Sequence, residues 1–192
     1  MCGNKALYEI TDILLSISQK WHCGYTLVVA GSMPRRSHST LNSMHLTLAH
    51  IGGRPASKDG FAALTQVYLE RCSAFAHCQA EAFRSEEAMA DWLARRPGRT
   101  APIVVLLDSR GRSMTSEAFA AWLGARRDAG AQHIVFAIGP AGGWSETPRQ
   151  NAHLQLSLGP MTFAHALARL VLAEQLYRAF TILSGHPYHA GH

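Results

Sequence analysis

The chain has 192 residues, of which 47% are apolar and 16% are charged. This length and composition suit one well-buried globular domain and exclude a disordered or fibrous protein. The formal net charge of +5 and the pI near 9.3 permit a polyanionic partner such as RNA. Many basic proteins bind no nucleic acid, so charge alone assigns no function.

Neither the cysteines nor the apolar segments indicate a zinc site, a secreted protein or a membrane protein. No CxxC pair occurs among Cys2, Cys23, Cys72 and Cys78. We expect free thiols in a reducing cytosol, with Cys72 and Cys78 flanking a loop. No apolar run approaches the roughly 20 residues of a membrane span. Acidic Glu9 and Asp12, before the short apolar run 13–17, do not suit a secretory signal, so we expect a cytoplasmic protein.

Residues 1–43 differ in character from the rest of the chain. A short amphipathic helix at 7–20 and a strand at 25–30 are expected, and a polar, linker-like segment follows at 32–43. Met44 then begins a clean strand pattern. Either residues 1–43 are an N-terminal extension, disordered or folded, or Met44 is the natural start and the preceding residues come from an upstream start codon. We favour the second interpretation and take 44–192 as the functional domain.

From Met44 onward, strand and helix patterns alternate, which predicts an α/β fold with a mainly parallel sheet and helices on both faces. The strands are expected at 45–51, about 79–83, 103–107, 133–138 and about 154–158. The helices are expected at about 58–75, from 86, from 116 to about 128, and at 167–184. Ser85 before Glu86 and Glu87 has the signature of an N-cap and an acidic first turn, and Thr115 or Ser116 caps the next helix. The continuous apolar run at 103–107 predicts a strand buried on both faces.

Ligands bind beyond the carboxyl ends of the strands in open α/β sheets. Those ends are predicted at Leu107–Asp108, at Ile138–Gly139 and at Leu158–Phe163. Gly139, Gly142 and Gly143 allow a close approach of the backbone to a ligand, although glycines after a strand are most often plain turn residues. Neither GxGxxG nor GxxxxGK[ST] occurs, so the chain lacks the phosphate-binding loops of dinucleotide-binding and P-loop proteins.

The last predicted helix carries charged residues among leucines, which is costly unless they are paired or functional. Because apolar residues occur on both of its sides, we expect it to be central or to lie in an oligomer interface. Glu174 and Arg178 stand at i,i+4 in the order that favours an intrahelical ion pair. Arg169 lies far round the helix from Glu174, and we expect its partner to be a phosphate or an acidic group of a second subunit. The tail His186–His189 is either a frayed end or functional, and its two histidines, without an accompanying carboxylate or thiol, predict no metal site.

Four segments of the chain resemble one family. The most specific is "LSLGPMTFAHALARLVLAEQLYRAFTILSGHPYH", from Leu156 to His189. "LTLAHIGGRPASKDGFAALTQVYLERC" from Leu46, "VVLLDSRGR" from Val104 and "IVFAIGPAGGW" from Ile134 are also similar to that family. The chain from Met44 onward resembles the bacterial ribosomal large-subunit pseudouridine N3-methyltransferases of the SPOUT superfamily.

The resemblance implies a homodimer in which each subunit ties a C-terminal trefoil knot around S-adenosylmethionine. It also implies methyl transfer, without a metal, to N3 of a pseudouridine in 23S rRNA of the ribosome or its large subunit. The cofactor contacts that it implies are Leu107, Gly139, Leu158, Gly159, Pro160, Met161, Thr162 and Phe163. The catalytic group that it implies, often completed across the dimer, is Tyr188, His189, Arg169 and Arg178. We expect His189 or Tyr188 to position or relay the N3 proton, and the two arginines to hold an RNA phosphate or the base edge.

Two departures from the family pattern concern the ligand loops. Pro140 stands where the family has the second glycine of a pair, and Ala164 stands where it tends to have proline. Because proline lacks an N–H and fixes φ, Pro140 is expected to reshape the rim of the pocket. Two alternative functions follow: a ribosome- or RNA-binding homologue without catalysis, or a SPOUT methyltransferase that acts on a different RNA.

Overall fold

One parallel sheet organises the part of the chain that the structure describes. The structure is a computed structural model and describes residues 44–54, 56, 59–96 and 100–189, so the expected extension at 1–43 lies outside the described residues. The strands of this part pair in the order β2-β1-β4-β3-β5, and every pair is parallel. They are β1 (His45–Ile51), β2 (His77–Phe83), β3 (Ile103–Ser113), β4 (His133–Ile138) and β5 (Leu154–Ser157). The predicted α/β fold is therefore confirmed.

Three of the helices in the described part of the chain begin at a side chain that accepts hydrogen bonds from the first turn. The helices of this part are α2 (Gly60–Cys72), α3 (Glu86–Ala94), α4 (Ser116–Asp128), α5 (Glu146–Asn151), α6 (His165–Ser184) and the 3₁₀ helix η2 (Pro187–His189). Ser85 caps α3 and Thr115 caps α4, as the sequence predicts, and Asp59 caps α2. Each of these side chains satisfies an N–H that the first helical turn leaves without a partner.

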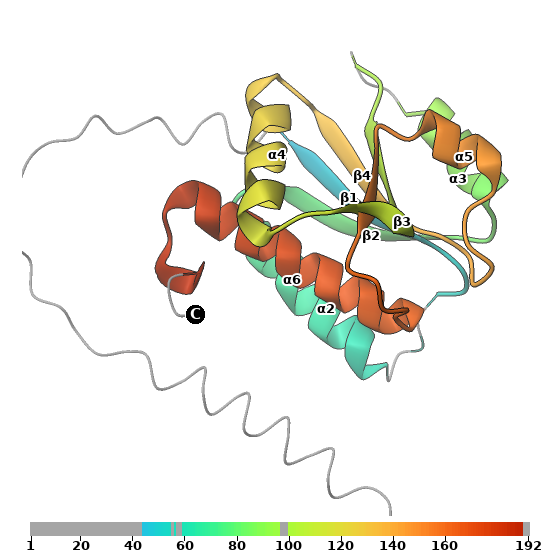
Figure 1. Cartoon of the computed structure of the whole chain (residues 1–192), viewed down its shortest axis with the longest axis horizontal. Helices are drawn as coiled ribbons and strands as arrows, with labels where there is room; N and C mark the ends of the chain where they lie inside the picture. Colours follow the sequence, from blue (N-terminus) through green and yellow to red (C-terminus); the bar gives the residue numbers. More distant parts are fainter. Residues whose placement is uncertain (1–43, 55, 57–58, 97–99, 190–192) are drawn as a thin grey trace, which may run out of the picture. The chain divides into compact units, whose positions relative to one another are not determined.

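Helices cover both faces of the sheet (Figure 1). On one face, α2, α4 and α6 enclose the main core, which includes Leu48, Phe136 and Leu172. On the other face, α3 covers a smaller core around Leu106 and Met89, and the start of α5 lies beside it, because the Ser145 N–H donates to Glu86 Oε1 at 3.1 Å. The helix α6 is buried along Leu172, Leu176 and Phe180 and half-exposed on its outer side. It is therefore a central helix of the described core, and its half-exposed side carries both apolar residues and the Glu174–Arg178 pair.

Several element boundaries differ from the prediction. The helix α2 ends three residues earlier than expected, and α6 starts two residues earlier. The strand β3 does not end near Leu107 but continues to Ser113, and only Val105 and Leu106 of its apolar run are fully buried. The helix α5 was not predicted, because six polar residues that include Pro148 carry no helical apolar pattern. Among the described residues, no helix combines the length and the apolar character that a membrane crossing requires.

Three histidines meet at the amino edge of the sheet, one from each of three neighbouring strands. The ring of His45 lies 4.9 Å from that of His77 and 6.3 Å from that of His133, between ring centroids. His133 Nε2 lies 2.9 Å from Thr47 Oγ1 and its ring packs edge-on against Trp92. Burial, with the nearby charges of Arg96 and His45, lowers the pKa of His133 from 6.5 to about 4. His133 is therefore neutral in the folded protein at neutral and mildly acidic pH.

We expect His133 to make the free energy of unfolding depend on pH. Between about pH 6.5 and pH 4, the unfolded chain takes up a proton at this residue and the folded chain does not, so stability is lost as the pH falls through this window. Between about pH 7 and pH 5, the free energy of unfolding should fall by on the order of 1 kcal/mol less in the variant His133→Gln than in the parent. Urea unfolding at the two pH values measures this difference, with the exposed neighbour His77→Gln as the control. Equal losses for His133→Gln and the parent would contradict the expectation.

Candidate active site

The carboxyl ends of β3, β4 and β5 enclose a cavity of about 350 Å³, which we call the carboxyl-edge cavity. It is lined by the segments 107–110 and 138–144, by residues 156, 158, 159 and 161–163, and by His165 and Ala168 of α6. These are the three strand ends at which the sequence predicts a ligand site. The rule that ligands bind beyond the carboxyl ends of parallel strands therefore points to an edge of the sheet that carries a cavity.

Seven of the eight predicted cofactor contacts line the carboxyl-edge cavity. They are Leu107, Gly139, Leu158, Gly159, Met161, Thr162 and Phe163. Pro160, the eighth, is exposed and is not part of the lining. Met161 is 75% exposed and belongs to the lining, so the cavity opens to solvent at this loop.

A bulge in β3 forms one wall of the cavity. Leu107 and Arg112 both pair with Leu156 of β5, so residues 108–111 stand out of the ladder between them. Gly111 is essential for this path, because a Cβ at Gly111 would lie 2.7 Å from the backbone of Gln155. The bulge brings Asp108, Ser109 and Arg110 to the cavity.

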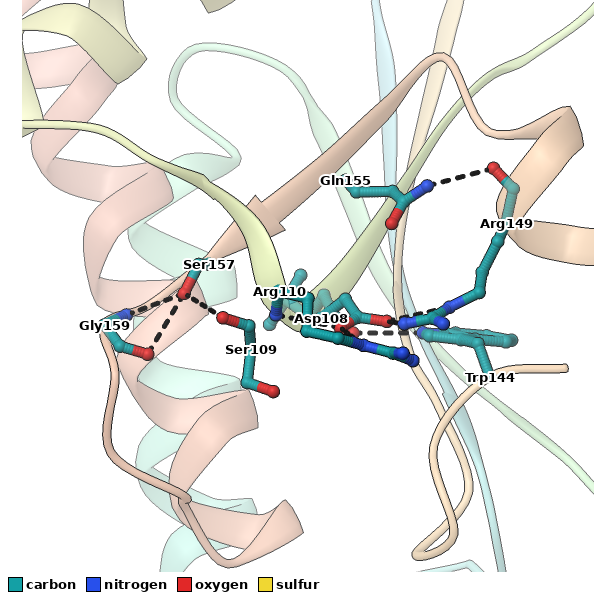
Figure 2. Close-up of polar contacts among 9 residues, drawn as sticks. Asp108, Ser109, Arg110, Trp144, Arg149, Gln155, Ser157 and Gly159 are labelled. Carbon is teal, nitrogen blue, oxygen red and sulfur yellow. Dashed lines mark hydrogen bonds and ion pairs between the residues drawn. The ribbon is translucent and has the colours of Figure 1, made fainter. Parts of the chain in front are cut away.

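Asp108 holds the bulge to α5 (Figure 2). Its carboxylate accepts hydrogen bonds from Arg149, one of them from Nε at 3.0 Å, and from the N–H of Arg110 at 2.9 Å. Burial alone would raise the pKa of Asp108, but the hydrogen bonds from Arg149 and Arg110 outweigh it and hold the pKa below its usual range. Asp108 is thus a carboxylate at neutral pH. This ion pair was not predicted, because α5, which carries Arg149, was not predicted either.

Trp144 joins the ends of β3 and β4. Its indole N–H donates to the carbonyl of Leu107 at 3.0 Å (Figure 2), and a Cβ at Gly139 would lie 2.9 Å from its ring. Trp144 therefore makes the close approach that the sequence predicts at Gly139. The packing of its indole ring explains this glycine at least as well as a ligand does. Gly142 and Gly143 have open space beside them. Pro140 lines the cavity without closing it, and its carbonyl accepts the N–H of Gly143 in a tight turn.

Ser157 fixes the loop that leads from β5 to α6. Its hydroxyl lies 3.3 Å from the carbonyl oxygen of Ser109 and 3.0 Å from that of Gly159, and it accepts the N–H of Gly159 at 3.1 Å (Figure 2). Gly159 has a φ of +130°, which L side chains rarely adopt. One hydroxyl therefore ties the wall formed by β3 to the loop that carries most of the predicted cofactor contacts. Ala164, the second departure from the family pattern, is the N-cap of α6 and makes no side-chain cap.

The polar partners of Arg169 among the described residues are His50 and Asp59 of its own chain. Its Nη1 lies 2.9 Å from His50 Nε2, and its Nη2 lies 3.7 Å from Asp59 Oδ2. Arg169 does not line the carboxyl-edge cavity but a second cavity between α2 and the strands β1 and β2. The sequence missed His50 and Asp59 because one looks like an ordinary strand residue and the other like a helix cap.

Tyr188 and Arg178 gather around Glu174 at the other end of α6. Arg178 donates to Glu174 Oε1 at 2.8 and 3.0 Å, which confirms the predicted ion pair, and the Tyr188 hydroxyl donates to the same oxygen at 3.3 Å. The rings of Tyr188 and Tyr177 lie 4.8 Å apart. Arg178 is 10 residues beyond Ala168, the last residue of α6 that lines the carboxyl-edge cavity, so along the helix it is about 15 Å away. Within one chain, Arg178 and Tyr188 therefore do not join the predicted cofactor contacts.

Three further predictions concern His189, the cysteines and metal binding. His189 ends η2, and its side chain lies outside what the structure describes. The described cysteines, Cys72 and Cys78, are free and lie on either side of the connection between α2 and β2, as predicted. No group of three or more histidine, cysteine or acidic side chains in the described ranges is placed to hold a metal ion.

A family model described as "Predicted SPOUT methyltransferase" matches residues 44–189. The chain belongs to this family. A curated relative, the ribosomal RNA large subunit methyltransferase H of Koribacter versatilis, is 47% identical over 149 residues, which are 78% of this chain and 100% of that protein. The relative of the same name from Rhizobium rhizogenes is 43% identical over 135 residues, 70% of this chain and 79% of that protein.

Similarity to a solved structure of the SPOUT type is weaker. The SpoU methyltransferase AviRb of Streptomyces viridochromogenes, in complex with the cofactor AdoMet, aligns with a TM-score of 0.43 and 15% identity. The alignment covers 76% of this chain and 62% of that chain. The family model and the two relatives confirm the resemblance read from the sequence, and the match to residues 44–189 leaves 1–43 outside the SPOUT region.

We expect Gly111→Ala to destabilise the protein, because its Cβ would press on the backbone of Gln155. Backbone cannot move aside as a flexible side chain can, so we expect a loss of about 2 kcal/mol. The matched control is Gly142→Ala, where a Cβ meets nothing within 4 Å and where we expect a change within about 0.5 kcal/mol. Equal effects of the two variants on urea unfolding would show that the bulge is not as tightly fitted to β5 as described.

Proposed function

We propose that the chain transfers the methyl group of S-adenosylmethionine to N3 of a pseudouridine in 23S rRNA of the large ribosomal subunit. The observation that carries the proposal is the gathering of seven predicted cofactor contacts around one cavity, in a chain that belongs to the SPOUT methyltransferases. The names of the two relatives support large-subunit rRNA as the substrate. Such a substrate implies a reaction in the bacterial cytoplasm.

The residues around the carboxyl-edge cavity fit S-adenosylmethionine. Leu107, Leu156 and Leu158 provide apolar walls, and the loops around Gly142 and Gly159 offer backbone groups. A cofactor without phosphate groups needs no glycine-rich phosphate loop, in keeping with the motifs that the sequence lacks. When bound, the cofactor supplies an electrophilic methyl group on a positively charged sulfur. The cavity persists with Pro140 in its lining, which favours the enzyme over the alternative of a non-catalytic RNA-binding homologue.

The chain's own contribution is to align the uracil ring and to accept the proton that N3 loses. Alignment of donor and nucleophile supplies most of the acceleration in such transfers. Burial, aided by a hydrogen bond with Tyr68, raises the pKa of Tyr188, so this phenol stays protonated and is suited to donate a hydrogen bond rather than to accept a proton. We therefore assign the proton to His189, because an unperturbed imidazole titrates near neutral pH. Arg178 is assigned to the RNA phosphate or the base edge.

We assign the tail of one subunit to the carboxyl-edge cavity of a second subunit, which a homodimer would provide. Arg178 lies about 15 Å along α6 from the last helical residue of the carboxyl-edge cavity of the same chain, and Tyr188 gathers with it around Glu174 and not at that cavity. The outer side of α2 exposes Phe61 (46%), Leu64 (41%) and Val67 (40%), an apolar stripe that a second copy would cover. The implied trefoil knot around the cofactor is a further part of the proposal.

The direct test is methyl transfer from labelled S-adenosylmethionine to large subunits of a strain that lacks the gene. We expect label in 23S rRNA, and mass mapping should place it on N3 of a pseudouridine. His189→Ala should lower kcat at least tenfold and leave the affinity for S-adenosylmethionine unchanged, because general acid–base contributions are about 10²- to 10⁴-fold. Full turnover of His189→Ala would remove the proton role. Label in another RNA would show that the chain methylates a different substrate. The absence of cofactor binding in calorimetry would favour the RNA-binding alternative.

A mixture of two inactive variants tests the shared site. Leu158→Arg obstructs the carboxyl-edge cavity and Tyr188→Ala removes the aromatic side chain of the tail. If the tail of one subunit serves the cavity of the other, refolding equal amounts together should restore up to about a quarter of the wild-type activity, because half of the dimers are mixed and each has one intact site. Each variant refolded alone is the control. No recovery in the mixture would mean that each tail acts on its own subunit or not at all.

A further inference from the structure

The second cavity is similar in size to the carboxyl-edge cavity, at about 350 Å³, and the proposed methyl transfer leaves it without a role. It lies between α2 and the carboxyl-terminal halves of β1 and β2. Its lining residues are Leu48, His50, Arg54, Ala62, Thr65, Gln66, Leu69, Ala80, Glu81, Ala82 and Arg169. Figure 1 shows α2 and α6, which flank this region, side by side.

The floor of the second cavity is apolar and made of small residues. Side chains alternate along a strand, and Leu48 pairs with Ala80 while His50 pairs with Ala82, so these four face the same side of the sheet. Glu81 contributes its backbone, because its side chain points to the opposite face, where it accepts a hydrogen bond from Gln79. The alanines on β2 leave room for a planar group against the sheet.

The charge of the second cavity is positive. Arg54 lines it and makes no ion pair among the described residues. The Arg169 side chain is only 10% exposed, and its nearest carboxylate oxygen, from Asp59, is 3.7 Å away. A nearly buried guanidinium with one distant counter-charge retains donors for a further anionic oxygen. The cavity thus combines cationic donors with an apolar floor.

The polar atoms around His50, beside this cavity, do not match the hydrogen bonds that its ring can make. Its Nε2 lies 2.9 Å from Arg169 Nη1, which can only donate, and 3.1 Å from the carbonyl of Gly53, which can only accept. One tautomer cannot serve both, and Nδ1 is buried without a hydrogen-bond partner in the described part of the chain. Burial, helped by Arg169, lowers the pKa of His50, so protonation does not resolve the conflict. Buried polar groups without a hydrogen-bond partner are rare in native structures, and each one calls for an explanation.

The second cavity adjoins the carboxyl-edge cavity across the first turns of α6. His165 and Ala168 line the carboxyl-edge cavity, and the next residue, Arg169, lines the second. The two cavities are close enough for the charge of His165 to influence His50. A chain molecule bound with one unit at the carboxyl-edge cavity can therefore place a neighbouring unit in the second cavity.

We propose that the second cavity binds one nucleotide of the RNA substrate that flanks the methylated one. Arg54 and Arg169 hold its phosphate, and its base lies against Leu48, Ala80 and Ala82. Proteins that read single-stranded RNA splay bases out in this way, and guanidinium groups suit phosphate oxygens. The inference rests on the proposed function, because it takes RNA as the substrate, and it assigns Arg169 to binding rather than to the reacting atoms.

Steady-state kinetics of methyl transfer to large subunits test the role of the second cavity. Arg54→Gln removes one phosphate donor, and Ala80→Leu fills the floor at an exposed position. Both should raise the KM for the RNA about tenfold, with kcat within about twofold and with unchanged affinity for S-adenosylmethionine. For Arg54→Gln, the slope of log KM against log salt concentration should fall by about 1. Arg95→Gln, the same change on α3 across the sheet, is the control and should match the parent.

Nuclear magnetic resonance of the full chain with uridine 5′-monophosphate tests the site without turnover. We expect the amide signals of Ala80 and Ala82 to shift on titration, and inorganic phosphate to bind at least tenfold more weakly. Shifts confined to the carboxyl-edge cavity, phosphate binding as tight as the nucleotide, or a KM unchanged in both variants would overturn the inference. If the parent protein fails to methylate large subunits, the proposed function is wrong. The titration tests nucleotide binding at Ala80 and Ala82 independently of that result.

Discussion

The contact of Trp144 with Leu107 and Gly139 is the constraint on which the carboxyl edge depends. Leu107 and Ile138 form the last pair between β3 and β4. The Trp144 N–H donates to the carbonyl of Leu107 at 3.0 Å, and Gly139 lets the indole ring lie against the backbone. With β3 and β4 joined at this point, the bulge at 108–111 and the loop held by Ser157 surround the cavity.

Much of the fold could be predicted because its signals are local. The caps at Ser85 and Thr115 and the apolar run at 133–138 are each readable within a few residues, and all agree with the structure. The continuation of β3 was missed because it depends on pairing with β5 across the bulge, which no local pattern shows. The helix α5 was missed because its position depends on Arg149 reaching Asp108 and on Ser145 meeting Glu86.

The candidate site also has features that could be predicted from the sequence and features that could not. The resemblance and the strand-end rule together identify the loops, because both refer to segments that are contiguous in sequence. The partners of Arg169 could not be found, since His50 and Asp59 lie more than 100 residues earlier and neither belongs to a recognisable motif. The distance of the tail from the cavity along α6 emerges only from the folded chain. Sequence reasoning thus finds the loops that line the carboxyl-edge cavity and misses the long-range polar contacts of Arg169.

The most direct measurement of the account is the position of S-adenosylhomocysteine in a crystal of the full chain. The account predicts the ligand in the carboxyl-edge cavity, in contact with the backbone at Gly139 and Leu158, with Tyr188 of a second subunit nearby and the Trp144 contacts unchanged. A ligand bound elsewhere, or a cavity closed by Pro140 and empty at saturating ligand, would contradict it.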